Sequence, residues 1–208
     1  MIVTDIKPVR KKRYQLYLDG NIAFILYKAD IKSYNITVDS EISEECYKDI
    51  LSSVLTKRAL LRTLHLLEKK DYTESQLRNK LKEGFYPAEI ADKTMESLKE
   101  YGYLNDEKYA LRYIEYKSKS KSDRAIRQDL AVKGIKSDVL DRAFDTFRQD
   151  NPDVNKVDLI YRLLTKRHYY EHEQDEKEKA KQYRFLAGKG FESGDIKQVS
   201  FRMKFDKS

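Results

Sequence analysis

One short pattern occurs three times in this chain, and this internal repeat constrains the fold more than any other feature. Each copy has an amphipathic helical run, a glycine, an apolar residue directly after it, and another apolar position six residues past the glycine. The copies cover residues 77–90, 126–140 and 183–196, with glycines at Gly84, Gly134 and Gly190. A glycine suits the left-handed residue that ends a helix, and the apolar residue after it suits the accompanying contact. The pattern predicts a helix-turn-helix unit copied three times.

The residues around each turn extend this prediction to a third helix per unit. Pro87, Ser137 and Ser193 each lie three residues after their glycine, where a first-turn proline or an N-cap serine belongs. The spacing between glycines leaves room for a preceding helix, which we expect at 60–68, 106–117 and 156–170, the last continued through 171–180. The expected fold is mainly α, with three tandem three-helix repeats in an elongated, curved array.

The N-terminal segment has a different period. Two β-prone runs, 14–18 and 22–27, flank the dipeptide Asp19-Gly20, which is typical of a tight β-hairpin. A lone hairpin is marginal in water, so we expect a third short strand near 36–38 or packing on the helices. We expect four segments: a hairpin segment at 1–40, a linker helix and first repeat at 41–104, a second repeat at 105–150, and a third, degenerate repeat at 151–208.

Composition supports a modular helical protein with an anionic partner. Hydrophobic residues make up 40% of the chain and charged residues 37%, so any core is thin and each unit must be covered by its neighbours. The net charge of +7 favours encounter with polyanions, although a plain solvated surface explains it equally well. Cys46 is the only cysteine, so no internal disulfide can form. Because neither a secretory signal nor a membrane-length apolar run is evident, we expect a cytoplasmic protein that does not bind membranes.

A search for catalytic motifs favours a binding protein over an enzyme. The glycine-lysine-glycine run at 188–190 lacks the upstream glycine and the following hydroxyl residue of a phosphate-binding loop. His168 and His172 lie four residues apart on an expected helix, a spacing that can hold a metal, but exposed polar residues are the simpler interpretation. We therefore expect no catalytic residues, no cofactor and no metal site.

At the second repeat the sequence resembles a known family. Its residues 102–110 read Gly-Tyr-Leu-Asn-Asp-Glu-Lys-Tyr-Ala, and residues 124–135 read Arg-Ala-Ile-Arg-Gln-Asp-Leu-Ala-Val-Lys-Gly-Ile. Both runs, with the hairpin and the repeats, are similar to the RecX family of regulatory proteins. Asn105 and Asp129 depart from its usual aspartate and glutamate, the basic linker at 117–122 lacks its usual glycine, and the third repeat carries a charged insertion at 171–181.

The resemblance implies a function that charge and periodicity do not. It implies a non-enzymatic regulator that lies along the groove of the RecA–single-stranded DNA filament. Such a regulator inhibits recombinase and ATPase activities and the coprotease activity of the SOS response. We expect a monomer whose contact with single-stranded DNA is indirect or weak. The alternative is a stand-alone nucleic-acid-binding protein that acts through a basic helical face.

Basic side chains of the second repeat are the predicted RecA- or DNA-binding residues. Lysine and arginine pair with phosphates or with carboxylates of a protein partner. The alternative is a solvated helical face. The predicted set is Arg112, Lys117, Lys119, Lys121, Arg124, Arg127 and Lys133.

Two further groups of residues have open interpretations. Tyr109, Tyr113 and Tyr116 share one helical face; we expect the first two in the core and leave Tyr116 open as a stacking residue. A basic segment at 7–13 either contacts DNA or the filament, or is a disordered arm.

Overall fold

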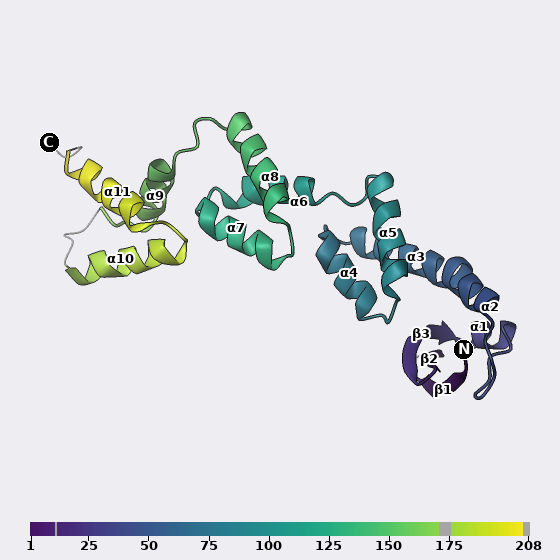
Figure 1. Ribbon diagram of the computed structural model, residues 1–208. Helices are drawn as coiled ribbons and strands as arrows, with labels where there is room; N and C mark the ends of the chain where they lie inside the picture. The colour runs from purple at the N-terminus through teal and green to yellow at the C-terminus, as the bar shows by residue number, and fades with distance from the viewer. Residues whose placement is uncertain (11, 171–175, 206–208) are drawn as a thin grey trace. The chain divides into compact units, whose positions relative to one another are not determined.

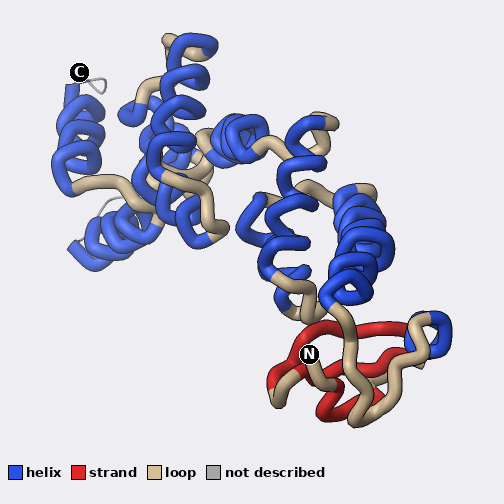
Figure 2. The backbone as a smooth tube through the Cα atoms, turned by 45° about the vertical axis from the view of Figure 1, so that its right-hand side comes forward, coloured by secondary structure: helices blue, strands red, loops and turns tan. Residues whose placement is uncertain are grey.

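The computed structural model describes residues 1–10, 12–170 and 176–205. The chain forms two compact units, Met1–Asn105 and Asp106–Ser208, which Figure 1 shows as a sheet with helices and as purely helical repeats. The chain is mainly helical, as the repeat pattern predicts, and Figure 2 shows that all strands gather at the N-terminal end of the chain. The elongated, curved arrangement of the whole array stays a prediction.

The N-terminal segment is a three-stranded antiparallel sheet that contains the predicted hairpin. Its strands are β1 (Val3–Pro8), β2 (Arg13–Leu18) and β3 (Asn21–Tyr27), in the order β1-β2-β3. Asp19 and Gly20 form the two-residue turn with φ of 48° and 80°, the positive values that a type I′ turn requires. One sheet face is buried, and its apolar side chains are Val3, Leu16, Leu18, Phe24 and Leu26.

The third strand is not where the sequence pattern placed it. Residues 36–38 form a loop, and β1 supplies the third strand by pairing along β2 from Val3↔Leu18 to Pro8↔Tyr14. Of the two alternatives for the basic segment, a disordered arm is wrong for Lys7, which pairs with Gln15, and for Arg13, which begins β2. Lys11 lies outside the described residues. The buried Val3 explains the difference, because it gives β1 an apolar contact with the core.

A helical run connects the sheet to the first repeat. A short helix, α1 (Lys28–Ser33), follows the sheet, and then α2 (Glu44–Asp49), the π-helical η1 (Ile50–Thr56) and α3 (Lys57–Leu67) follow one another without a break. Ser43 caps this run, since its Oγ accepts a hydrogen bond from the Cys46 N–H at 3.1 Å. Ile50, Leu51 and Leu55 bury this run in the same core as the sheet.

Each repeat has three helices and a buried cluster of apolar side chains. The first contains α3, α4 (Glu74–Lys82) and α5 (Ala88–Glu100), and shares its core with the sheet. The second contains α6 (Asp106–Lys117), α7 (Asp123–Val132) and α8 (Ser137–Asp150). The third contains α9 (Lys156–Thr165), α10 (Glu176–Gly188) and α11 (Ser193–Phe205).

The first helix of the third repeat is shorter than the sequence suggests. The expected helix at 156–170 ends at Thr165, and the chain turns at His168, whose φ is 56°. The Tyr169 N–H donates to the Leu164 carbonyl at 3.2 Å, which closes this helix end. The expected continuation at 171–175 lies outside the described residues, and α10 begins at Glu176.

The left-handed turn residue is a glycine in two repeats only. Gly134 and Gly190 have φ of 83° and 86°, as predicted, but in the first repeat Phe85 takes this conformation with φ of 58°. In all three turns, the carbonyl of the last buried leucine in the helix accepts a hydrogen bond from the N–H five residues later. The donor and acceptor pairs are Tyr86 and Leu81, Ile135 and Leu130, and Phe191 and Leu186. The buried leucine therefore sets the position of the turn, and Gly84 precedes that position by one residue.

The starts of the following helices also differ from the prediction. Pro87 is the N-cap residue of α5, whereas Ser137 is the first residue of α8 and Lys136 is its N-cap. Ser193 is likewise the first residue of α11. A serine at the first helical position is outside the N-cap, so Ser137 does not have the predicted role.

Candidate partner-binding surface of the second repeat

The second repeat displays its basic residues on α6, on the following linker and on α7. Ala110, Ile114, Ile126 and Leu130 are buried, so the apolar period of both helices faces the core. Ser122 is the N-cap residue of α7, since its Oγ accepts a hydrogen bond from the Ala125 N–H at 3.3 Å. The predicted binding residues alternate with this apolar period, but the structure gives them different surroundings.

Lys121 is engaged with an acid of its own repeat. Its Nζ lies 2.6 Å from Oδ2 of Asp129, and the Tyr113 hydroxyl donates to the same oxygen at 2.9 Å. The hydrogen bond from Lys121 holds the pKa of Asp129 below its usual value. Burial, followed by the hydrogen bond to Asp129, raises the pKa of Tyr113 to about 12. Lys121 thus ties the basic linker to α7 and to α6.

This three-residue contact predicts a pH-dependent contribution to stability. Because the pKa of Asp129 is lower in the folded chain, its contribution is present above the unfolded pKa and is lost as pH falls through the folded value. We expect Asp129→Asn to lower the free energy of unfolding by about 1 kcal/mol at pH 7. Urea denaturation of both proteins between pH 7 and pH 2 measures this, and a difference that does not shrink at low pH contradicts it.

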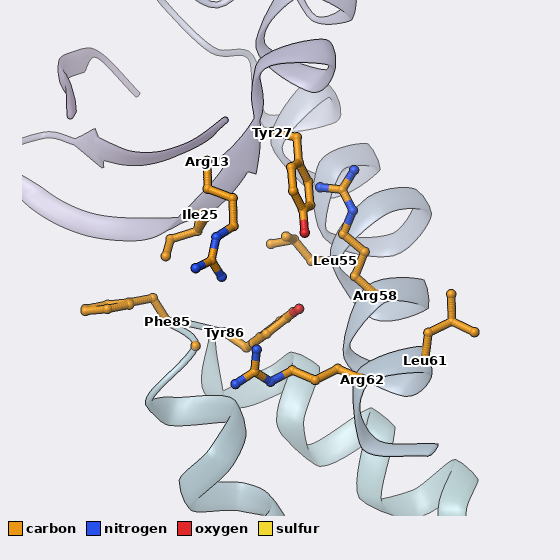
Figure 3. A pocket seen from close by; sticks show the side chains of 10 residues that line it. Arg13, Ile25, Tyr27, Leu55, Arg58, Leu61, Arg62, Phe85 and Tyr86 are labelled. Carbon is orange, nitrogen blue, oxygen red and sulfur yellow. The ribbon is translucent and has the colours of Figure 1, made fainter. Parts of the chain in front are cut away.

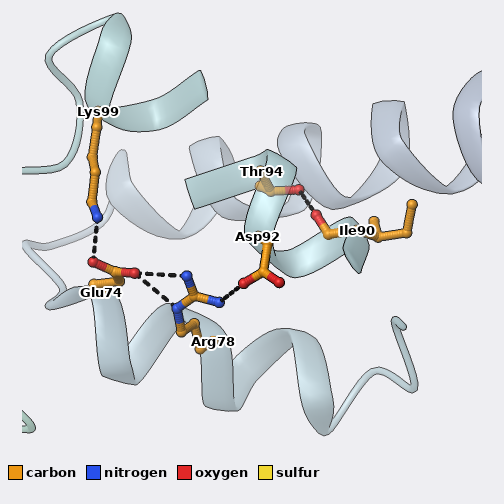
Figure 4. Close-up of polar contacts among 6 residues, drawn as sticks. All are labelled: Glu74, Arg78, Ile90, Asp92, Thr94 and Lys99. Carbon is orange, nitrogen blue, oxygen red and sulfur yellow. Dashed lines mark hydrogen bonds and ion pairs between the residues drawn. The ribbon is translucent and has the colours of Figure 1, made fainter. Parts of the chain in front are cut away.

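Arg127 is engaged in a contact that links the second and third helices of its repeat. Its Nη1 lies 2.7 Å from Oδ1 of Asp141, and its guanidinium carbon lies 4.3 Å from the centre of the Phe144 ring. The first repeat contains the same pair, with Arg78 Nη1 lying 2.5 Å from Oδ1 of Asp92 (Figure 4). Each pair joins residues that are 14 positions apart. Arg127 therefore occupies a structural position of the repeat.

The first and second repeats share a second ion pair at equivalent positions. Lys99 Nζ lies 2.6 Å from Oε2 of Glu74 (Figure 4), and Arg148 Nη2 lies 3.1 Å from Oδ2 of Asp123. Every partner in the second repeat stands 49 residues after its counterpart in the first. The sequence contains this signal, but an alignment on Gly84 and Gly134 uses a spacing of 50 and hides it.

The third repeat has lost these pairs. The residues at the four corresponding positions are Lys179, Tyr183, Lys197 and Lys204. In the place of the buried Ile126, it buries Gln182, whose Oε1 accepts a hydrogen bond from Arg167 Nε at 2.8 Å. The third repeat is thus degenerate in its polar contacts as well as in its sequence.

The other predicted basic residues are more available to a partner. Lys119 and Arg124 are exposed, and within the described part of the chain neither has an ion pair or a side-chain hydrogen bond. Lys117 Nζ lies 4.7 Å from the centre of the Tyr116 ring, and Lys133 Nζ lies 5.7 Å from that of Tyr113. Arg112 is exposed but makes a contact within the chain.

The tyrosines of α6 divide as expected. Tyr109 and Tyr113 are partly buried and pack against the core of the second repeat. Tyr116 is 70% exposed, and Lys117 lies beside its ring. The ring of Tyr116 therefore adds an open aromatic face next to Lys117.

The described residues contain neither a cluster of metal ligands nor a membrane-length apolar helix. Over residues 1–10, 12–170 and 176–205, no three histidine, cysteine or acidic side chains gather as metal ligands would. His168 lies in a turn and not on the expected helix, and His172 lies outside the described residues. Within the same ranges, no helix combines the length and the apolar character needed to cross a membrane.

Comparisons with known proteins recognise all three repeats. A family model described as the second three-helix domain of RecX matches residues 105–143, and models of the first and third three-helix domains match 59–98 and 153–199. The chain belongs to the RecX family. The RecX resemblance of the second repeat thus extends to the first and third repeats.

Individual RecX proteins are similar over nearly the full length. "Regulatory protein RecX" of Clostridium perfringens (strain 13 / Type A) is 32% identical, with 91% of this chain and 90% of the relative covered. The protein of that name from Caldanaerobacter subterraneus is 28% identical, with 96% and 98% covered. A crystal structure of regulatory protein RecX has a TM-score of 0.61 at 27% identity, covering 96% of this chain and 98% of its own.

Proposed function

We propose that this protein binds the RecA–single-stranded DNA filament and inhibits its recombinase, ATPase and SOS coprotease activities. In this proposal it acts as a cytoplasmic monomer, without a cofactor or catalytic residues. Membership of the RecX family through all three three-helix domains carries the proposal. The homologues are named as regulatory proteins, which fits a binding function better than catalysis.

The proposed contact surface is the basic face of the second repeat. Lys119 and Arg124 are its main members, because both are exposed and can meet a carboxylate or a phosphate. The half-buried Lys117 joins them, with its Nζ beside the exposed Tyr116 ring. Lys121 and Arg127 support this face through their own ion pairs. Arg112 and Lys133 complete the predicted set.

The decisive experiment measures ATP hydrolysis by RecA on single-stranded DNA while this protein is added at substoichiometric amounts. We expect hydrolysis to slow and filaments to shorten in electron micrographs, since one bound regulator affects many RecA subunits. Unchanged hydrolysis and unchanged filament length at an equimolar amount would rule out the proposal.

A second candidate function is direct binding of nucleic acid. The observation that favours it is the exposed Tyr116 ring beside Lys117, because an aromatic ring next to a cation can stack on an unpaired base. Phosphate contacts make affinity fall steeply with salt. Tight, salt-sensitive binding to DNA alone, with no effect on RecA when DNA is in excess, would favour this function.

A further inference from the structure

A cavity of about 380 Å³ lies in the first unit, and none of its lining residues belongs to the second repeat. It is bounded by β2 and β3, by the helical run through η1 and α3, and by the turn between α4 and α5 (Figure 3). Aliphatic side chains of Ile25, Leu55 and Leu61 form part of its lining. The remaining lining is polar and aromatic: Arg13, Arg58, Arg62, Tyr27, Phe85 and Tyr86. A cavity with apolar walls and a few convergent polar groups is the usual form of a ligand site.

One of the three arginines already holds a carboxylate. Arg58 Nη1 and Nη2 lie 2.6 and 2.8 Å from the two carboxylate oxygens of Asp30, a bidentate arrangement. Its guanidinium carbon also lies 4.5 Å from the centre of the Tyr27 ring. The charge of Arg58 is therefore balanced, and its pair with Asp30 shows how a carboxylate is held in this wall.

The other two arginines have no acid partner among the residues that the structure describes. Arg13 Nε donates only a long hydrogen bond, of 3.4 Å, to the Arg10 carbonyl. Arg62 Nε is buried and has no acceptor. In Figure 3 the side chains of Arg13 and Arg62 extend from opposite sides, and in this view the Tyr86 ring lies between them. Both arginines nevertheless line the cavity, and an oxyanion bound there would give their guanidinium groups the anionic partner that Asp30 gives Arg58.

The turn at the edge of the cavity departs from the other repeats. Phe85 adopts the left-handed conformation, with φ of 58°, where the second and third repeats have glycine, and it remains 41% exposed. A Cβ on Gly84 would lie 2.9 Å from the Tyr86 ring, so the glycine allows that ring to fold across it. Backbone strain of this kind is concentrated at ligand sites. The strained backbone of this turn thus holds the rings of Phe85 and Tyr86 at the cavity.

We propose that this cavity binds an acidic peptide segment of a protein partner. One carboxylate lies between Arg13 and Arg62, and an adjacent apolar side chain lies against Phe85 and Leu61. The Arg58–Asp30 pair favours a carboxylate, and the aliphatic walls favour a peptide over a nucleotide. Arg58 already covers the Tyr27 ring, which removes that face from base stacking. The site lies outside the surface proposed above, and its test contains no recombinase, so the two proposals fail separately.

The test uses the full chain and a fluorescein-labelled eight-residue peptide with two glutamates and two leucines. Binding is followed by fluorescence anisotropy and compared with the same peptide carrying glutamine in place of glutamate. We expect the double variant Arg13→Gln/Arg62→Gln to bind the glutamate peptide roughly tenfold or more weakly, the loss of about one charge-assisted contact. The matched control is Lys57→Gln/Lys69→Gln, which removes the same charge from exposed positions and should leave binding within about twofold.

Two further variants keep the result decisive. Arg13→Gln alone changes a half-buried residue at the start of β2 and serves if the double variant does not fold. Arg13→Lys/Arg62→Lys keeps the charge but removes the planar fork, and should also weaken binding. Equal binding of the two peptides, or binding that does not depend on either arginine, would overturn the proposal. Binding of an oligothymidine in place of the peptide, lost in the same variants, would assign the cavity to nucleic acid and overturn it as well.

Discussion

Reversing Lys117, Lys119 and Arg124 to glutamate is expected to abolish inhibition of RecA while the helices stay folded. The three side chains act through charge, Lys119 and Arg124 from exposed positions and Lys117 from a half-buried one, and glutamate at each position repels the acidic or phosphate groups that they attract. None of the three belongs to the buried clusters of the second repeat. RecA ATP hydrolysis measures inhibition, and circular dichroism measures helix content.

Two comparisons make this result specific. Lys57, Lys69 and Lys93 are exposed residues of the first unit, and their reversal produces the same change in net charge, so inhibition should persist. Single alanine variants of the second repeat should weaken inhibition only mildly, because one exposed ion pair contributes about 0–1 kcal/mol. Full inhibition by the folded triple variant would place the RecA contact on another surface.

Lys121 and Arg127 are left unchanged in this design because the structure gives them internal partners. Lys121→Glu would place a second carboxylate beside Asp129, and Arg127→Glu would place one beside Asp141. Both changes would lower stability and confuse loss of binding with loss of folding. Sequence alone treated all seven basic residues alike, and the ion pairs separate them.

Replacing Gly190 with alanine is expected to cause a large loss of stability. Gly190 has φ of 86°, and a Cβ there would lie 2.5 Å from Ser122 Oγ and 2.7 Å from Ala125 Cβ. The left-handed conformation costs about 1–2 kcal/mol and overpacking about 1–3 kcal/mol, so we expect a loss of roughly 3 kcal/mol. Because Ser122 is the N-cap residue of α7 and its N–H also donates to the Lys189 carbonyl at 3.1 Å, the effect should reach the second repeat. Urea denaturation followed by circular dichroism measures the loss in the free energy of unfolding. Faster amide hydrogen exchange in α7 would show that the loss extends to the second repeat.

Substitutions at two other glycines distinguish backbone strain from overpacking. Gly102 has φ of 72° but no atom within 4 Å of a Cβ position, so Gly102→Ala measures the backbone strain alone, about 1–2 kcal/mol. Gly188 has open space and an ordinary helical backbone, so Gly188→Ala should be neutral or slightly stabilising. A loss for Gly190→Ala no greater than that for Gly102→Ala would mean that the second and third repeats do not press together at this point.

Much of the fold could be predicted from local signals. The Asp19-Gly20 turn, the apolar helical periods and the glycines at 134 and 190 each act over a few residues, so their meaning does not depend on distant parts of the chain. The family resemblance of residues 102–110 and 124–135 was also a matter of local order and spacing. These signals determined the number of repeats, the class of fold and the family.

Tertiary structure decided what those signals left open. The third strand came from β1 and not from residues 36–38, because pairing partners and a buried Val3 depend on the rest of the core. Phe85 rather than Gly84 became the turn residue because the buried leucine sets where the helix closes. The cavity with Arg13 and Arg62 had no sequence pattern, since its walls come from a sheet, a helix and a turn far apart in the chain. The structure likewise decides which basic residues form ion pairs within the chain. Lys121 and Arg127 pair with acids that are 8 and 14 residues away in the sequence, and only the packed structure brings those acids into contact with them.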